Sequence, residues 1–215
     1  MNTQESFKTI ARRKIAGWYS RTEWEDKAVE RMTAVRDEII GLLRSTGREG
    51  VEDVIEYLDS RGFYYRASSP TGHHNFPGGL AEHSLGTYKR AQAKAGDLPA
   101  DSVIIAALLH DICKADRFWF KGRTILKHTE RTAIDRAHSS RSIAILKDCG
   151  LRLTESERLA IRWHMKDEFY RPRDPRKAAD HAKAANDPLW RVVFYADKAD
   201  AGSSRHNHSN RQDIH

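Results

Sequence analysis

The adjacent residues His110 and Asp111 close the apolar run 103–109 and are the most chemically informative feature of the chain. An imidazole and a carboxylate at the end of an apolar segment are costly to bury unless another group satisfies them. Imidazole nitrogen and carboxylate oxygen are good ligands for first-row divalent ions. The pair therefore predicts part of a metal site at the end of a helix.

Further residues of the same two types lie before and after this pair, namely His83, His138, His164 and Asp197. Taken singly, each histidine is more often a hydrogen-bonded residue than a ligand, and Asp197 could equally form a solvated salt bridge. Taken together, they occupy separate predicted helices, and helical bundles build metal sites from ligands on different helices. The pattern alone leaves open a shared metal site and a set of unrelated polar residues.

Cationic side chains close to these residues in sequence could neutralise charge on a phosphoryl group. Lys114 lies three residues after Asp111, so on a continuing helix the two side chains would be neighbours. Further candidates for contact with substrate are Arg117, Arg141, Lys166, Lys198 and Arg205. For each the alternative is a solvated surface charge, which we favour for Arg117 and Arg205.

His73 and His74 precede the turn Pro77-Gly78-Gly79 and could contact substrate at the rim of a pocket, or simply pack within the loop. Cys113 has no recognisable base partner and is expected to serve packing. The remaining histidines are expected at the surface: His128, His181, His206, His208 and His215.

The composition is typical of one soluble domain with an anionic partner. The 215 residues carry a net charge of +7, which favours a nucleotide, a nucleic acid or a phosphorylated metabolite, although many basic proteins bind none of these. The two cysteines form no C-x-x-C motif, which favours a reducing cytoplasm. No stretch reaches the roughly eighteen apolar residues of a membrane span. We expect a cytoplasmic protein without a membrane partner and make no prediction of its oligomeric state.

Hydrophobic periodicity predicts an all-α bundle. The expected helices cover residues 22–43, 51–62, 80–95, 101–111, 138–150, 154–164 and 190–201, and a short one at 178–185 would interrupt a surface segment at 166–188. Thr22 and either Asp101 or Ser102 are expected helix caps, and Thr154 with Glu157 forms a capping box. A short β-hairpin is possible within residues 118–127.

The predicted organisation has three parts. Residues 1–65 would form N-terminal helices that pack on the core, and residues 66–201 would carry the candidate ligands. Residues 202–215 are polar and rich in histidine, asparagine and serine, which predicts a flexible tail.

The ordered set of histidines and aspartates resembles the HD superfamily of metal-dependent phosphohydrolases, which is named for the adjacent pair. The likeness spans about residues 72–205. Residues 73–83, HHNFPGGLAEH, are similar to the HHxFxGGLxxH motif of a bacterial branch that includes 3′→5′ exoribonucleases. Residues 108–114, LLHDICK, resemble the LLHDIGK segment of the family, with Cys113 where glycine is usual.

The resemblance implies a helical domain that hydrolyses a phosphomonoester or a phosphodiester with metal-activated water. By position, one ion would be held by His83, His110, Asp111 and Asp197. His138 and His164 match the histidines with which some members hold a second ion, and Asp111 would then bridge the two. Asp111 and Lys114 are the expected catalytic residues. Histidine ligands favour Mn, Fe, Co, Ni or Zn over Mg.

The resemblance leaves several functions open. The exoribonuclease-like motif favours RNA or DNA, whereas the lack of a recognisable OB-type domain before residue 72 favours a small nucleotide or help from a partner. One branch of the superfamily uses a similar cage for di-iron oxygen chemistry. A non-catalytic nucleotide-binding module is the third possibility, because a fold alone does not fix a function.

Overall fold

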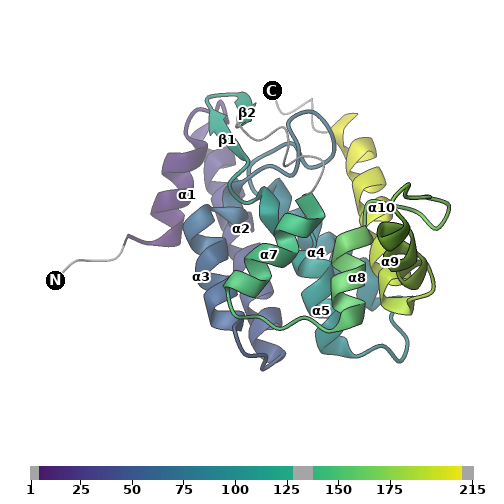
Figure 1. Ribbon diagram of the computed structural model, residues 1–215. Coiled ribbons are helices and arrows are strands. Elements are labelled where there is room, and N and C mark those ends of the chain that lie inside the picture. Colours follow the sequence, from purple (N-terminus) through teal and green to yellow (C-terminus); the bar gives the residue numbers. More distant parts are fainter. Residues whose placement is uncertain (1–4, 128–137, 210–215) are drawn as a thin grey trace.

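The most apolar helix of the chain lies at the centre of the bundle in the computed structural model, which describes residues 5–127 and 138–209, with side chains up to residue 203 (Figure 1). This helix, α5 (Ala100–Leu109), buries every residue from Ser102 onward. A helix that is apolar on all sides must be covered on all sides, and α5 contacts α2, α4, α8 and α10. It therefore delivers His110 into the interior.

Two long helices and a shorter one surround α5 on the side that carries the candidate ligands. They are α4 (Gly79–Gln92), α8 (Glu155–Trp163) and α10 (Pro188–Ser209). Helix α4 packs between α5 and α10, and α8 contacts both α5 and α10. Two further helices, α7 (His138–Asp148) and α9 (Pro175–Ala185), flank α8 (Figure 1).

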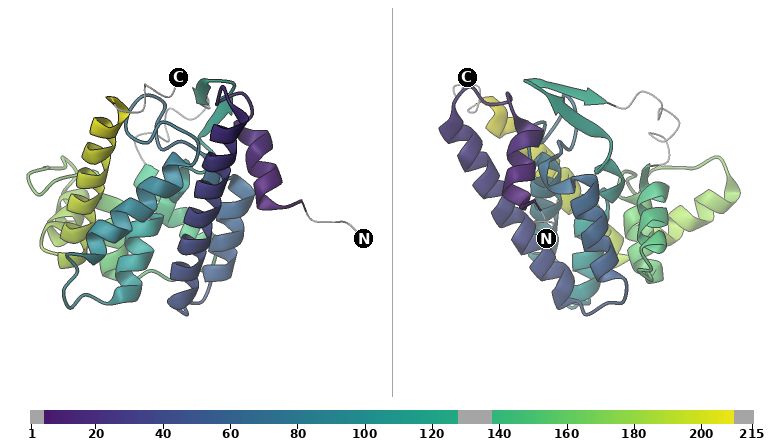
Figure 2. Two further views of the ribbon diagram at one scale, coloured as in Figure 1. Left: turned by 180° about the vertical axis from the view of Figure 1, so that it is seen from behind. Right: turned by 90° about the vertical axis from the view of Figure 1, so that its left-hand side faces the viewer.

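The N-terminal helices form the opposite side of the molecule, as the views from behind and from the side show (Figure 2). They are α1 (Phe7–Ile15), α2 (Thr22–Ser45), α3 (Val51–Arg61) and the short 3-10 turn η1 (Phe63–Tyr65). The predicted apolar face of α2 is buried, with Val29, Met32 and Leu43 in the core. Helix α1 was not predicted, because its buried residues Ala11 and Ile15 stand among basic residues in a short segment.

The predicted hairpin is confirmed. Strands β1 (Phe118–Lys121) and β2 (Thr124–Lys127) pair antiparallel, with Lys121 opposite Thr124, so that two residues form the turn. Gly122 adopts a φ of +54° there, a conformation that glycine tolerates best. The Phe120 ring packs edge-on against Trp18, with ring centroids 4.9 Å apart, which ties the hairpin to the N-terminal helices.

The helix ends show which sequence signals were correct. The capping box of α8 is present, with Thr154 and Glu157 each bonding the other's backbone. Thr22 is the first residue of α2 rather than its cap, and α5 begins at Ala100, before the expected cap. Ser102 instead donates a hydrogen bond to the buried Glu157 carboxylate at 2.8 Å. The Ser102 hydroxyl therefore bonds a residue of another helix and does not cap α5.

The last two helices are longer than predicted. Helix α9 begins at Pro175, with Asp174 accepting hydrogen bonds from the backbone of Arg176 and Lys177. Proline at the first helical position is favourable because it lacks only a hydrogen that would have no partner there. Helix α10 continues to Ser209, past the predicted end at residue 201. None of the described helices is long and apolar enough to cross a membrane.

Candidate metal centre

Two of the candidate ligands stand at equivalent places, each just after the last residue of a helix. His110 follows α5 and His164 follows α8. His110 Nδ1 donates to the Ala107 carbonyl at 2.8 Å, and His164 Nδ1 donates to the Ile161 carbonyl at 2.7 Å. The final carbonyls of a helix lack partners within the helix, so these bonds satisfy them. They also fix the ring tautomer, so that Nε2 carries no proton and its lone pair can bind a metal.

The first group of ligand atoms joins three helices in the interior. His83 on α4 places Nε2 3.4 Å from His110 Nε2 and 3.1 Å from Asp197 Oδ1 on α10. Asp111 Oδ2 lies 3.4 Å from His110 Nε2 and 3.9 Å from His83 Nε2. All four residues are buried. The structure thus brings together the four residues that the resemblance assigned to one ion.

The second group faces the other oxygen of the same carboxylate. His138 Nε2 and His164 Nε2 lie 3.4 Å apart, and they stand 3.8 and 3.6 Å from Asp111 Oδ1. Asp111 therefore turns one oxygen toward each group of histidines. This is the arrangement that a carboxylate bridging two cations requires.

The donor atoms fit divalent cations. Asp111 Oδ1 is buried and has no hydrogen-bond partner among the described residues, a costly state that a cation would relieve. Burial alone would raise the pKa of Asp111, but Lys114 and His110 outweigh it and hold this pKa well below its usual range. The carboxylate is therefore charged, and with imidazole nitrogens it suits Mn, Fe, Co, Ni or Zn.

Asp200 is a member of the site that sequence reasoning missed. Its Oδ2 accepts a hydrogen bond from His83 Nδ1 at 2.8 Å, so His83 presents Nε2 to the first group. Gly86 makes room for it, because a Cβ there would lie 2.2 Å from Asp200 Oδ1. A signal did exist, since Asp200 follows Asp197 by three residues and thus shares its helix face.

The charge of His83 follows from these two carboxylates. Burial by itself lowers the pKa of His83, but hydrogen bonds to Asp197 and Asp200 and the charge of Asp111 outweigh burial. The pKa of His83 rises to about 9. Without a metal ion, the His83 ring is therefore protonated on both nitrogens and positively charged at neutral pH.

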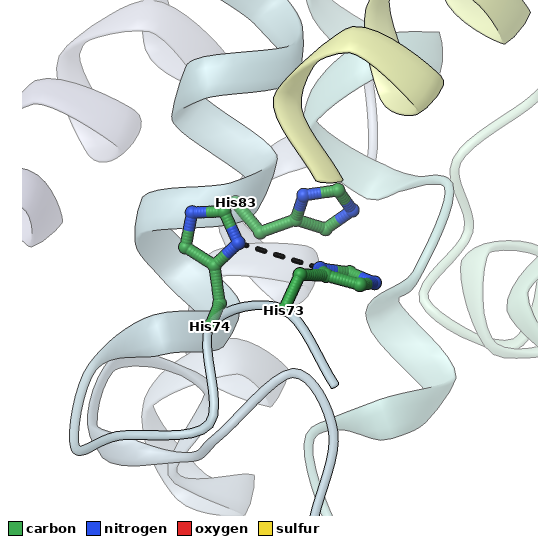
Figure 3. Close-up of side chains that lie close together, drawn as sticks. All are labelled: His73, His74 and His83. Carbon is green, nitrogen blue, oxygen red and sulfur yellow. Dashed lines mark hydrogen bonds between the residues drawn. The ribbon is translucent and has the colours of Figure 1, made fainter. Parts of the chain in front are cut away.

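His73 and His74 both lie against His83, in the loop before α4 (Figure 3). Their Nδ1 atoms are 3.3 Å apart, and the rings of His73 and His83 have centroids 4.7 Å apart. His74 has a φ of +51°, and its carbonyl approaches so closely that a Cβ at Gly79 would lie 2.1 Å from it. Burial is the largest factor that lowers the pKa of His73 to about 4, so its ring is neutral. The two histidines thus border the first group, with nitrogens that could contact substrate.

The predicted cations divide into one that reaches the centre and several whose contacts lie elsewhere. Lys114 Nζ lies 2.6 Å from Asp111 Oδ2, on the short 3-10 turn η2 (Ile112–Lys114) rather than on a continued α-helix. Arg141 pairs with Asp116 at 3.0 Å. Lys166 and Lys198 are exposed and lie over the rings of Tyr170 and Phe194, respectively. Arg117 lies over the Phe118 ring. The side chain of Arg205 lies outside the described residues.

The prediction for His181 was wrong. It is 3 % exposed, because the rings of Trp163, Tyr170 and Trp190 converge on it from three segments, a convergence that local sequence cannot reveal. Cys113 is buried, and burial raises its pKa to about 11, which agrees with a packing role. The other histidines predicted at the surface lie outside the described side chains: His128, His206, His208 and His215.

The family of the chain can be stated on this geometry and on sequence comparison. Comparison with curated proteins and with solved structures gave no match. The model of the HD domain family matches residues 80–202, which is more than half of the chain. The matched segment contains both groups of ligand atoms. The chain belongs to the HD domain family, and with it to a superfamily of metal-dependent phosphohydrolases.

Proposed function

We propose that this protein hydrolyses a phosphomonoester or phosphodiester bond with two divalent ions, and that its substrate is a nucleotide or a nucleic acid. The observation that carries the proposal is the division of the Asp111 carboxylate between the two groups of histidines. Two ions held on either side of this carboxylate would supply an acidified water and would neutralise charge on the oxygens of a phosphoester.

The residues of the chain have separate roles in this proposal. His83, His110 and Asp197 would hold one ion and His138 and His164 the other, with Asp111 between them. The Nδ1–H bonds of His83, His110 and His164, to Asp200 or to helix-end carbonyls, orient these three rings before any ion binds.

Lys114 is the proposed electrophilic partner of the phosphoryl group. It is 13 % exposed at the side chain and already lies beside Asp111, so its ammonium stands at the border between the ligand groups and the surface. A cation there stabilises the negative charge that develops on the phosphoryl oxygens. His73 and His74 border the same centre and are the proposed substrate contacts of the loop.

The substrate class is supported by charge. The chain carries a net charge of +7, and a positive field raises the local concentration of polyanions. The resemblance of residues 73–83 to the exoribonuclease branch points the same way. We keep the di-iron oxygenase function as an outcome of the test, because the donor set suits iron as well.

The test compares the purified protein with an Asp111→Asn variant by elemental analysis and by hydrolysis assays with Mn²⁺ or Co²⁺. The substrates are nucleoside mono-, di- and triphosphates, cyclic dinucleotides and short RNA. We expect Asp111→Asn to lose both bound metal and hydrolysis. Full hydrolysis in the variant would refute the proposal, and oxygen consumption by an iron-loaded protein without hydrolysis would favour the oxygenase.

A further inference from the structure

The exposed large apolar side chains of the described residues gather in one place. They are Met165, Phe169, Tyr170 and Tyr195, with exposed fractions of 45 %, 75 %, 37 % and 51 %. The first three lie on the loop between α8 and α9, and Tyr195 lies on α10. The Tyr195 hydroxyl donates to Glu168 Oε1 at 3.0 Å, so α10 and the loop form one continuous surface.

This loop is held in place by contacts with the two flanking helices and by a hydrogen bond of its own. The Tyr170 ring packs on Trp163 and His181, with centroids 6.2 and 5.5 Å away. The Asp167 carboxylate accepts the Phe169 backbone N–H at 3.1 Å, which fixes the chain where Phe169 projects into solvent. An exposed ring on an ordered backbone loses little conformational freedom when it binds, which makes it an effective contact.

The loop and the first turn of α9 together carry a net positive charge, with five cations against three carboxylates between residues 166 and 177. Elsewhere, arginines such as Arg36 and Arg44 pair with carboxylates through two hydrogen bonds. On the stretch from 171 to 177, four cations have no carboxylate oxygen within 4.0 Å among the described residues: Arg171, Arg173, Arg176 and Lys177. The loop carboxylates are otherwise engaged, since Glu168 accepts from Tyr195 and Asp174 caps α9.

The position of the loop links it to the metal centre. It begins directly after His164, whose Nε2 faces Asp111, and it extends outward from the end of α8 beside α10 (Figure 1). A polymeric substrate with one phosphate at the centre would need a nearby surface for its neighbouring units, and this loop starts beside the centre.

We propose that the aromatic–basic surface, formed by Met165, Lys166, Phe169, Tyr170, Arg173 and Tyr195, binds single-stranded nucleic acid. Bases would stack on the exposed rings while the cations neutralise phosphates, a combination typical of proteins that bind single strands without sequence preference. The proposal rests on the proposed function, because it names a polymer as the substrate of the same centre. With this surface, the domain itself would supply contacts that hold a polymer.

Charge favours this occupant over a second copy of the chain. In a two-fold dimer each patch meets its own copy, so the unpaired cations of the loop would face one another. Like charges placed together across an interface are unfavourable, whereas a polyanion complements them. We therefore treat self-association as a result that would overturn the proposal.

The test measures binding apart from catalysis. A fluorescein-labelled oligothymidylate is titrated with Asp111→Asn protein in EDTA, and anisotropy is recorded over a range of salt concentrations. We expect Phe169→Ala to weaken binding about tenfold at every salt concentration, because one stacked base is lost. Arg173→Ala should instead reduce the slope of log affinity against log salt by about 0.7, the value for one phosphate contact on a single strand.

One control variant completes the design. Lys147→Ala removes an exposed cation at the far end of α7 and should change neither affinity nor slope. Circular dichroism checks that each variant is folded.

The outcomes separate this proposal from the proposed function. Binding that Phe169→Ala and Arg173→Ala leave unchanged, or a complete lack of binding, overturns the aromatic–basic surface while hydrolysis of small nucleotides can still hold. Dimers that dissociate on Phe169→Ala, with no oligonucleotide bound, overturn it in favour of self-association. Binding without hydrolysis by the metal-loaded parent keeps the surface and refutes the phosphohydrolase proposal.

Discussion

The two sides of Asp111 differ in how firmly the chain holds them. On the first side, His83 on α4 and His110 just after α5 are fully buried, and each Nδ1 is fixed by a partner inside the bundle. On the second side, His138 is the first residue of α7, with a side chain that is 15 % exposed. His164, the other ligand of the second side, is as buried as His110, and its Nδ1 is fixed in the same way. The difference between the two sides therefore lies in His138 alone, which stands at the edge of the core.

The comparison predicts different losses when each side is broken. His83→Gln should abolish binding at the first side and, through the shared Asp111, weaken the second. His138→Gln should remove only the ion of the second side and leave one ion per chain. Elemental analysis after dialysis, together with nucleotide hydrolysis, gives both numbers. Equal losses of metal from the two variants would contradict the proposed asymmetry.

The Asp200 carboxylate sharpens the comparison because it acts on the first side alone. Removing such a partner of a ligating histidine typically lowers metal affinity by about 10- to 100-fold. Asp200→Asn keeps the shape of the side chain and removes its charge. We therefore expect this loss of affinity for the ion at the first side and little change for the ion at the second side. Isothermal titration with Mn²⁺ measures both affinities. Unchanged affinity at the first side would show that the 2.8 Å bond to His83 has no such role.

Substitutions at two glycines test the position of Asp200 through packing. Gly86→Ala places a Cβ 2.2 Å from Asp200 Oδ1 and should destabilise the protein by about 1–3 kcal/mol while displacing Asp200. Gly41→Ala on α2 has open space around its Cβ and should stabilise by about 0.5–1 kcal/mol through helix propensity. Urea unfolding compares the two. The prediction fails if Gly86→Ala is as stable as Gly41→Ala.

The smallest expected effect at the first side comes from the release of a proton by His83. The pKa of His83 is raised to about 9, so the metal-free protein gains stability from its proton below pH 6.5 and loses that gain as pH rises through 9. Metal binding must displace this proton, so affinity at the first side should rise with pH up to about 9. Calorimetry in buffers of different ionisation enthalpy counts the released protons. Uptake of a proton, or no exchange at pH 7, would contradict this assignment.

The sequence predicted most of what depends on local pattern. The His110–Asp111 pair at the end of an apolar run, the capping box at Thr154 and the hairpin at 118–127 each carry their own signal, and the structure confirms them. The pairing of Asp200 with His83 joins α4 to α10 across the bundle, so its signal was visible only as spacing along one helix.

Other features depend on tertiary contact and had no local signal. His181 became buried because aromatic rings from α8, α10 and the connecting loop meet around it. Lys166 and Lys198 are close to ligands in sequence, yet each lies over a neighbouring ring at the surface, because a long side chain can turn away from its sequence neighbours. Whether these two lysines contact substrate remains a prediction.

The most direct test of the central claim is anomalous X-ray diffraction from crystals soaked in Mn²⁺. The division of Asp111 between two histidine groups predicts two anomalous peaks, one beside His83, His110 and Asp197 and one beside His138 and His164. Their separation should be about 3.5–4 Å, as in other two-metal sites, with one Asp111 oxygen on each ion. A single peak, or two peaks that do not share Asp111, would contradict the account.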